Sequence, residues 1–182
     1  MSNEPALDVS EFLAASLRWL FEGNHGLAAM LSDLTIEELH HRPSAKSSSI
    51  GFDAWHVART VDDLVNFVLL REPTVWREQN LFERWGLPRN SQGTGMTDEE
   101  AAALRFPEPA LLARYALDVS ASVAPKIERM SDEFLAGEIE MRGLRTRTRL
   151  YLVGNIALIQ SSNHLGQIAH ARTLLGKPGL GM

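Results

Sequence analysis

Apolar residues recur every three or four positions through four long segments of this 182-residue chain. These segments cover residues 8–31, 49–70, 108–130 and 148–175. This spacing gathers apolar side chains on one face of an α-helix, whereas a β-strand requires alternation. The pattern therefore predicts an all-α fold, a four-helix bundle, in which residues 1–182 form a single domain.

The connection between the second and third long segments, residues 71–107, is unusually long and contains tryptophans, glycines and prolines. This mixture is typical of an ordered excursion. Thr97 and Glu100 have capping-box spacing, so a short helix is expected over residues 98–104. The excursion allows a crossover between helices, and it could serve as a lid over a site or as an interface.

Composition narrows the possible functions. A formal net charge of −5, with scattered basic residues, disfavours binding to nucleic acid or to an anionic membrane. Because the chain has no cysteine, a metal would be held by His, Asp, Glu, Gln or water. No stretch reaches the ~18 apolar residues of a membrane span, and the first residues lack the features of a secretory signal, so we expect a cytoplasmic protein.

Two histidines occupy positions in the apolar stripes of predicted helices. His56 lies in the segment 49–70, and His164 lies in the segment 148–175. Buried polar groups require partners, and metal sites are commonly built between the facing helices of a bundle. If the two helices are neighbours, both imidazoles would meet at one ion.

Two glutamines accompany His164. With an α-helical step, Gln160 lies about 40° and Gln167 about 60° from His164, so both are predicted to face inward. Gln160 precedes His164 by four residues, a separation that lets two side chains approach one ligand. Gln160 is therefore a candidate metal ligand through its amide oxygen.

A structural interpretation competes with the metal site. Each histidine could be a core residue that is hydrogen-bonded to a carboxylate. Asp63 shares the predicted face of His56, within about 20°, and is the expected partner. Asp63 could instead act as an oxygen ligand or orient an imidazole from behind.

Five motifs resemble the DinB-like superfamily in order and spacing. The five motifs are LTIEELHHRP (34–43), SIGFDAWHVART (49–60), WGLP (85–88), TGMTDEE (94–100) and NHLGQIAHARTLLG (163–176). The resemblance implies a four-helix bundle that is related to bacillithiol- and mycothiol-dependent S-transferases and is expected to form a homodimer. It also implies a divalent ion, nickel or zinc, held by one histidine of the second helix and two of the last helix.

The resemblance maps the ligands onto His56, Gln160 and His164, so one family histidine is replaced here by glutamine. A carboxamide binds zinc or nickel less well than an imidazole, and the ion is expected to be weakly bound or absent.

If the ion binds, the resemblance implies hydrolysis or thiol S-transfer on a small molecule, which could be a low-molecular-weight thiol. Asp63 or Gln167 would orient the nucleophile. Arg59, Arg145, Arg147 and Arg149 could receive an anionic substrate or thiol, although the run at 142–149 also suits a solvated loop. The alternative is a non-enzymatic bundle, either a metal- or small-molecule-binding protein or a dimeric structural one, with a vacant or degenerate metal site.

Overall fold

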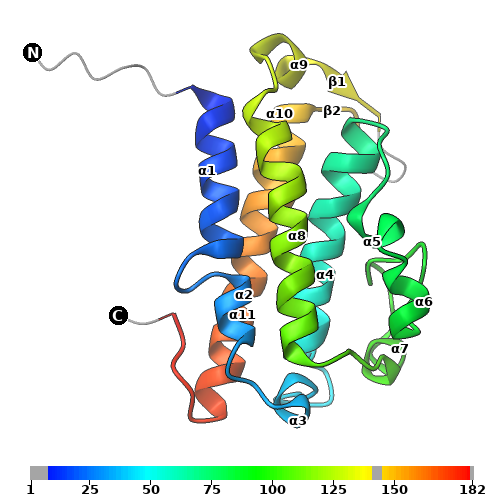
Figure 1. The fold of residues 1–182 in the computed structure, drawn as a ribbon, viewed down its shortest axis with the longest axis vertical. Coiled ribbons are helices and arrows are strands. Elements are labelled where there is room, and N and C mark those ends of the chain that lie inside the picture. Colours follow the sequence, from blue (N-terminus) through cyan, green and yellow to red (C-terminus); the bar gives the residue numbers. More distant parts are fainter. Residues whose placement is uncertain (1–7, 141–144, 181–182) are drawn as a thin grey trace, which may run out of the picture.

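Long helical segments stand side by side in the computed structural model, which describes residues 8–140 and 145–180 (Figure 1). The segments are α1 (Val9–Glu22) with α2 (Leu27–Leu31), α4 (Ile50–Asp62) with the π-helix η1 (Asp63–Leu69), α8 (Pro109–Glu128), and α10 (Arg149–Leu152) with the π-helix η2 (Val153–Gln160) and α11 (Ser161–Leu174). Helix α1 packs on α8, α8 on α4, and α4 on α11, while η2 returns to α1. These contacts close a bundle around one apolar core, and the all-α prediction is confirmed.

Shorter elements connect the long segments. They are α3 (Ile36–Leu39), α5 (Val75–Glu78), α6 (Leu81–Trp85), α7 (Asp98–Ala103), α9 (Asp132–Ala136), β1 (Glu138–Ile139) and β2 (Arg147–Thr148). Strands β1 and β2 pair antiparallel, with Glu138 opposite Thr148. The predicted capping box of Thr97 and Glu100 is present at the start of α7.

The expected helix over residues 8–31 is broken into two. The chain leaves the helix at Gly23 in an extended conformation and re-enters it after Gly26. A Cβ atom added at Gly23 would lie 2.6 Å from the carbonyl oxygen of Trp19. The prediction of one continuous helix was therefore wrong, because the two glycines permit a tight turn that apolar periodicity does not reveal.

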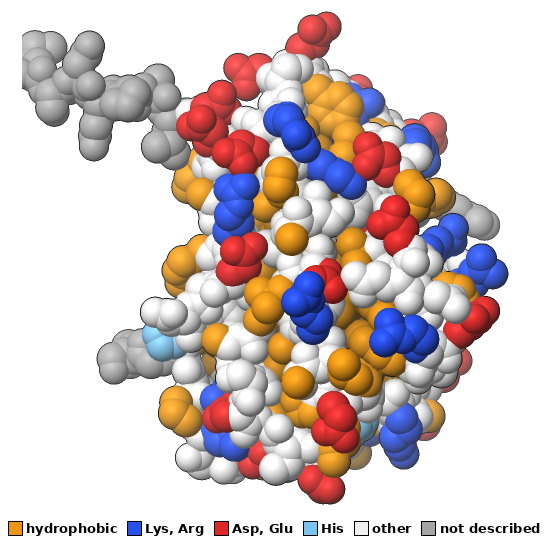
Figure 2. Space-filling model, viewed as in Figure 1, with side chains coloured by type: hydrophobic (Ala, Val, Ile, Leu, Met, Phe, Trp, Pro, Cys, Tyr) orange, Lys and Arg blue, Asp and Glu red, His pale blue; other side chains and the backbone are white. Residues whose placement is uncertain are grey.

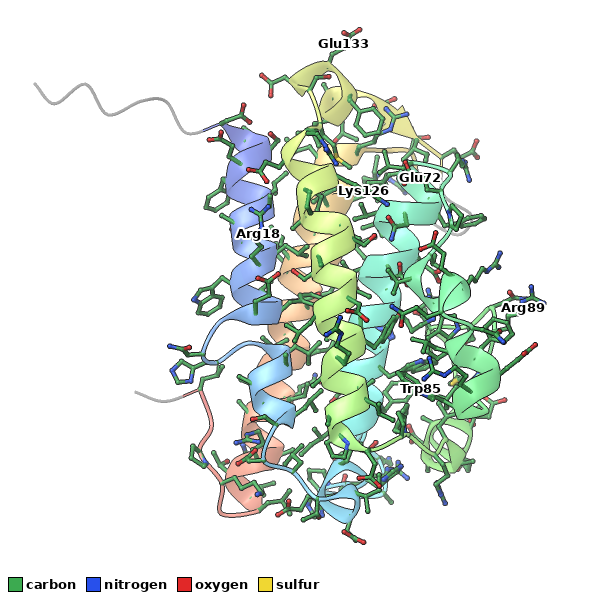
Figure 3. The ribbon with its side chains drawn as sticks, in the orientation of Figure 1. Arg18, Glu72, Trp85, Arg89, Lys126 and Glu133 are labelled. Carbon is green, nitrogen blue, oxygen red and sulfur yellow. The ribbon has the colours of Figure 1, made fainter. Side chains whose placement is uncertain are left out.

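The excursion of residues 71–107 produces a crossover. Asp62 of α4 accepts a hydrogen bond from Tyr115 of α8, and Glu72, just beyond the end of η1, pairs with Lys126 further along α8 at 2.7 Å. Residue numbers increase together from the first contact to the second on both segments, so α4 with η1 runs parallel to α8. Figure 3 shows Glu72 and Lys126 toward the same end of the bundle. The crossover that the long connection suggested is therefore present.

A buried carboxylate anchors the excursion to the bundle. Asp62 is fully buried and accepts hydrogen bonds from the backbone N–H groups of Val75 (3.0 Å) and Trp76 (2.9 Å). It also accepts from the Tyr115 hydroxyl at 3.0 Å and from the Asn66 amide at 2.8 Å. Four donors compensate the loss of hydration. Asp62 thus joins α4, α5 and α8.

The outer surface carries charges of both signs. On the face seen in Figure 2, acidic and basic side chains are interspersed rather than separated by sign. Within the described ranges, none of the helices combines the length and the apolar character needed to cross a bilayer.

Candidate functional site

The two histidines singled out in the sequence meet between α4 and α11. The ring centroids of His56 and His164 lie 4.8 Å apart, and the ring planes are inclined at 66°. Both side chains are half-buried. The predicted approach of the two imidazoles is confirmed, while their coordination of a metal stays a prediction.

Each ring is oriented through its Nδ1 atom. Nδ1 of His56 lies 2.6 Å from the carbonyl oxygen of Gln92, and Nδ1 of His164 lies 3.1 Å from Oδ1 of Asp53. A carbonyl and a carboxylate accept hydrogen bonds, so each Nδ1 carries the proton. In the neutral form of each ring, Nε2 therefore keeps a free lone pair, and neither Nε2 has a hydrogen-bond partner among the described residues.

A glycine, Gly93, allows the excursion of residues 71–107 to approach α4 closely near His56. Gly93 has a φ of +98°, and a Cβ atom added there would lie 2.7 Å from Cζ of Phe52. Its close approach to α4 brings the preceding carbonyl, that of Gln92, against the imidazole. Phe52 also stacks on His56, with centroids 6.0 Å apart and planes inclined at 8°. Part of the excursion thus forms a wall of the histidine site.

Asp53 is a site residue that the sequence interpretation missed. The residue is 4% exposed, and the Ser48 hydroxyl lies 2.8 Å from each of its carboxylate oxygens. Asp53 precedes His56 by three residues, a spacing that puts both on neighbouring parts of one helix surface. That spacing is the signal that could have identified it.

Burial keeps the His56 ring neutral. The pKa of His56 is lowered from its ordinary value chiefly because burial disfavours the charged imidazolium. The bond to Gln92 opposes this shift, the neighbouring His164 adds to it, and Asp53 opposes it. The neutral ring has a lone pair ready for a cation.

Asp63 does not orient either histidine, contrary to the prediction. Its two carboxylate oxygens each accept a hydrogen bond from the guanidinium of Arg59 at 3.0 Å. Arg59 is 1% exposed, and its guanidinium carbon lies 5.1 Å from the ring centroid of Trp76. The expectation that Arg59 receives an anionic substrate is also wrong, because its buried guanidinium is already paired with Asp63.

Gln160 and Gln167 are both exposed, so their predicted inward orientation is wrong. The buried residues of α11 are Ser161, Leu165, Ile168, Ala169, Ala171 and Arg172. This stripe is centred about 70° away from His164, on the side opposite both glutamines. The predicted orientation of the glutamines assumed the angular step of an α-helix throughout this segment. In the π-helix η2, i→i+5 hydrogen bonds change the angular step per residue.

The arginines of the run 142–149 do not converge on the histidines. Arg145 is exposed, and residues 142–144 lie outside the described residues. Arg147 lies over the ring of Tyr151 at 5.3 Å, and Arg149 lies over that of Phe134 at 4.4 Å. Arg149 precedes His164 by fifteen residues along one helical segment, a separation of about 20 Å. The described part of the run therefore belongs to the far end of the bundle.

The local donor set is small. Among residues 8–140 and 145–180, His, Cys, Asp and Glu side chains form no group of three or more that could hold a metal ion. A cation at the histidine pair would therefore need water, substrate or an amide oxygen to complete its coordination.

The fold and the site define a helical-bundle protein with a pair of oriented histidines between two helices. The sequence model of the DinB superfamily matches residues 22–168, so the chain belongs to this superfamily. The fold is also similar to the crystal structure of a conserved protein from Enterococcus faecalis, with a TM-score of 0.80 and 24% identity. That similarity covers 94% of this chain and 100% of the other, and it shows the fold alone. None of the curated proteins matches this chain.

Proposed function

We propose that this chain is a divalent-metal-dependent enzyme that acts on a small molecule by hydrolysis or thiol S-transfer. The observation that carries the proposal is the orientation of His56 and His164. Both Nδ1 atoms have acceptors, and both Nε2 atoms remain free on rings 4.8 Å apart. Metal-binding histidines in proteins are oriented by hydrogen bonds of this kind.

The residues that would hold the ion are His56 and His164. Gln160 is a further, weaker oxygen donor, since it ends η2 one helical turn before His164 and its side chain is exposed. Nickel or zinc suits imidazole ligands. When bound, such an ion lowers the pKa of water or a thiol and so supplies a nucleophile at neutral pH.

The protein's own contribution is to fix the two rings. Asp53 holds the tautomer of His164, and Ser48 holds Asp53. Gln92 does the same for His56, while stacking of Phe52 restricts rotation of that ring. A ligand set oriented in advance loses less conformational entropy when it binds a cation.

A non-enzymatic bundle with a degenerate metal site is the second candidate. The exposure of Gln160 favours it, because an exposed carboxamide is a weak third ligand. In that case the histidine pair, with Asp53 and Gln92, would be a hydrogen-bonded polar cluster or a site for a small molecule.

Metal analysis of protein purified without a histidine tag separates the two candidates. The enzyme proposal expects close to one nickel or zinc ion per chain after incubation with that metal and desalting. The ion should be lost in His56→Ala and in His164→Ala but retained in His25→Ala, which removes an exposed histidine elsewhere. Absence of metal in the wild type, with unchanged stability after chelator treatment, would favour the second candidate.

We also propose that the protein forms a homodimer through the face shared by α1 and η2. Large apolar side chains are exposed on this face, with Trp19 at 62%, Phe12 at 54% and Ile159 at 55%. They line a mainly apolar groove of about 490 Å³. A second copy is the occupant that we favour, because one apolar face can bury itself against its own copy around a two-fold axis.

A further inference from the structure

A separate pocket of about 540 Å³ lies beside the histidine pair, between α11 and the loop that precedes α4. Its polar lining includes Lys46, Ser48, Asp53, Asn163, Gln167 and His170. The volume is within the range of ligand sites for small molecules. Because Asp53 both lines this pocket and binds His164, the pocket adjoins the proposed reaction centre.

The pocket has a charged rim and a hydrogen-bonded floor. Lys46 is exposed, and no described carboxylate lies within ion-pair distance of its ammonium group. The carboxylate of Asp53, at the floor, already accepts from Ser48 and His164. The ammonium group of Lys46 at the rim of the pocket is thus available to pair with a negatively charged ligand.

Two side-chain amides, those of Asn163 and Gln167, also line the pocket. Asn163 and Gln167 are four residues apart on α11, so their side chains stand one above the other on the pocket wall. Both are exposed and can donate and accept hydrogen bonds. This explains the position of Gln167 better than the inward orientation predicted from sequence.

We infer that this pocket binds the carboxylate end of a small amide-containing carboxylic acid. The carboxylate of the ligand pairs with Lys46, and the side-chain amides of Asn163 and Gln167 form hydrogen bonds with the amide group of the ligand. Lys46 and the buried Asp53 line the same pocket, and the Asp53 carboxylate repels a phosphate dianion more than a singly charged carboxylate, because repulsion grows with the charge of the ligand. As a substrate site the pocket rests on the proposed function, but as a binding site it does not.

Gly166 provides a way to close the pocket without disturbing the fold. It lines the pocket, and a Cβ atom added there meets nothing within 4 Å. Gly166→Leu therefore places a side chain in the open space. Gly154→Leu is the matched control, since this helical glycine also has nothing within 4 Å of an added Cβ and does not line the pocket.

The test titrates metal-free protein with N-acetyl-glycylglycine and, separately, with its C-terminal amide, following amide signals by NMR. The acid should shift the signals of Gly166 and the side-chain amides of Asn163 and Gln167. Its affinity should exceed that of the neutral amide by about fivefold, the range of a partly solvated ion pair. Inorganic phosphate should bind more weakly than the acid.

Two variants then assign the binding. Lys46→Gln should reduce the affinity for the acid to that for the amide, whereas Arg84→Gln removes an exposed charge elsewhere and should change nothing. Gly166→Leu should abolish the shifts, and Gly154→Leu should retain them, with circular dichroism confirming that both are folded. Equal binding of acid and amide, tighter binding of phosphate, or shifts that map elsewhere would overturn the inference. Since no metal is present, these outcomes do not depend on whether His56 and His164 bind an ion.

Discussion

Asp53 on α4 contacts His164 on α11 across 111 residues of sequence, with Oδ1 of the carboxylate 3.1 Å from Nδ1 of the ring. The contact joins two neighbouring helices of the bundle and fixes which nitrogen of His164 is free. A nearly buried carboxylate in this position also makes the imidazole a better ligand, because it stabilises positive charge on the ring.

Replacing Asp53 with Asn should weaken divalent metal binding. The carboxamide keeps the shape of the side chain but loses its charge, and such changes behind a ligand typically cost about 10- to 100-fold in affinity. Isothermal titration with zinc or nickel measures the effect. An affinity equal to that of the wild type would show that Asp53 does not act through His164.

Gly93→Ala should destabilise the protein more than Gly95→Ala. Both glycines have positive φ, at +98° and +82°, so both substitutions introduce backbone strain. Only at Gly93 would the new Cβ collide with Phe52, at 2.7 Å, while nothing lies within 4 Å at Gly95. We expect an additional loss of about 1–3 kcal/mol of unfolding free energy at Gly93, measured by urea denaturation. Equal losses would mean that the loop shifts freely and does not hold Gln92 against His56.

Asp62→Asn should cost about 3 kcal/mol or more of unfolding free energy. The amide nitrogen of asparagine is itself a donor, so it would face hydrogen-bond donors that the Asp62 carboxylate now accepts from. Tyr115→Phe removes one of the four donors and should cost about 1 kcal/mol. Chemical denaturation of both variants tests the ranking. A milder effect for Asp62→Asn than for Tyr115→Phe would exclude Asp62 as the main anchor of the excursion.

The metal-free protein should lose stability as the pH falls below about 6.5, partly through His56. Burial lowers the pKa of this ring in the folded state from its ordinary value of 6.5, so the unfolded chain takes up the proton first. The stabilisation is complete above pH 6.5 and declines as the pH falls toward the lower, folded pKa. In His56→Gln the unfolding free energy should decline less steeply with acid over this range. Identical slopes would contradict the lowered pKa.

Trp19→Lys should shift the proposed dimer toward monomer in size-exclusion chromatography with light scattering. A charge on this face opposes its burial against a second copy. Leu111→Lys is the control, since it places the same charge on an exposed apolar position of α8. A wild-type protein that is monomeric at high concentration would rule out the proposed interface.

The sequence predicted the long helices and the meeting of His56 with His164, because apolar periodicity identifies which helix faces turn inward. It did not distinguish Asp53 from Asp63. Asp63 is closer to His56 in angle, but it lies about 10 Å further along the helix axis, where it meets Arg59 instead.

Other features depend on contacts that a single helical pattern does not contain. The orientation of Gln160 is altered by η2, which apolar spacing alone did not reveal. The role of Gln92 depends on the approach of Gly93 to Phe52, a contact between a loop and a helix that are distant in sequence. Local patterns predict elements, whereas these contacts arise from tertiary packing.

The most direct test of the central claim is ¹⁵N NMR of the histidine side chains, recorded near pH 7.5 with and without zinc. We predict that, without metal, His56 and His164 both carry the proton on Nδ1, and that one equivalent of zinc shifts both Nε2 signals together. A proton on Nε2 of either ring, or zinc addition that leaves both Nε2 signals unchanged, would contradict the proposal that the two imidazoles form one cation site.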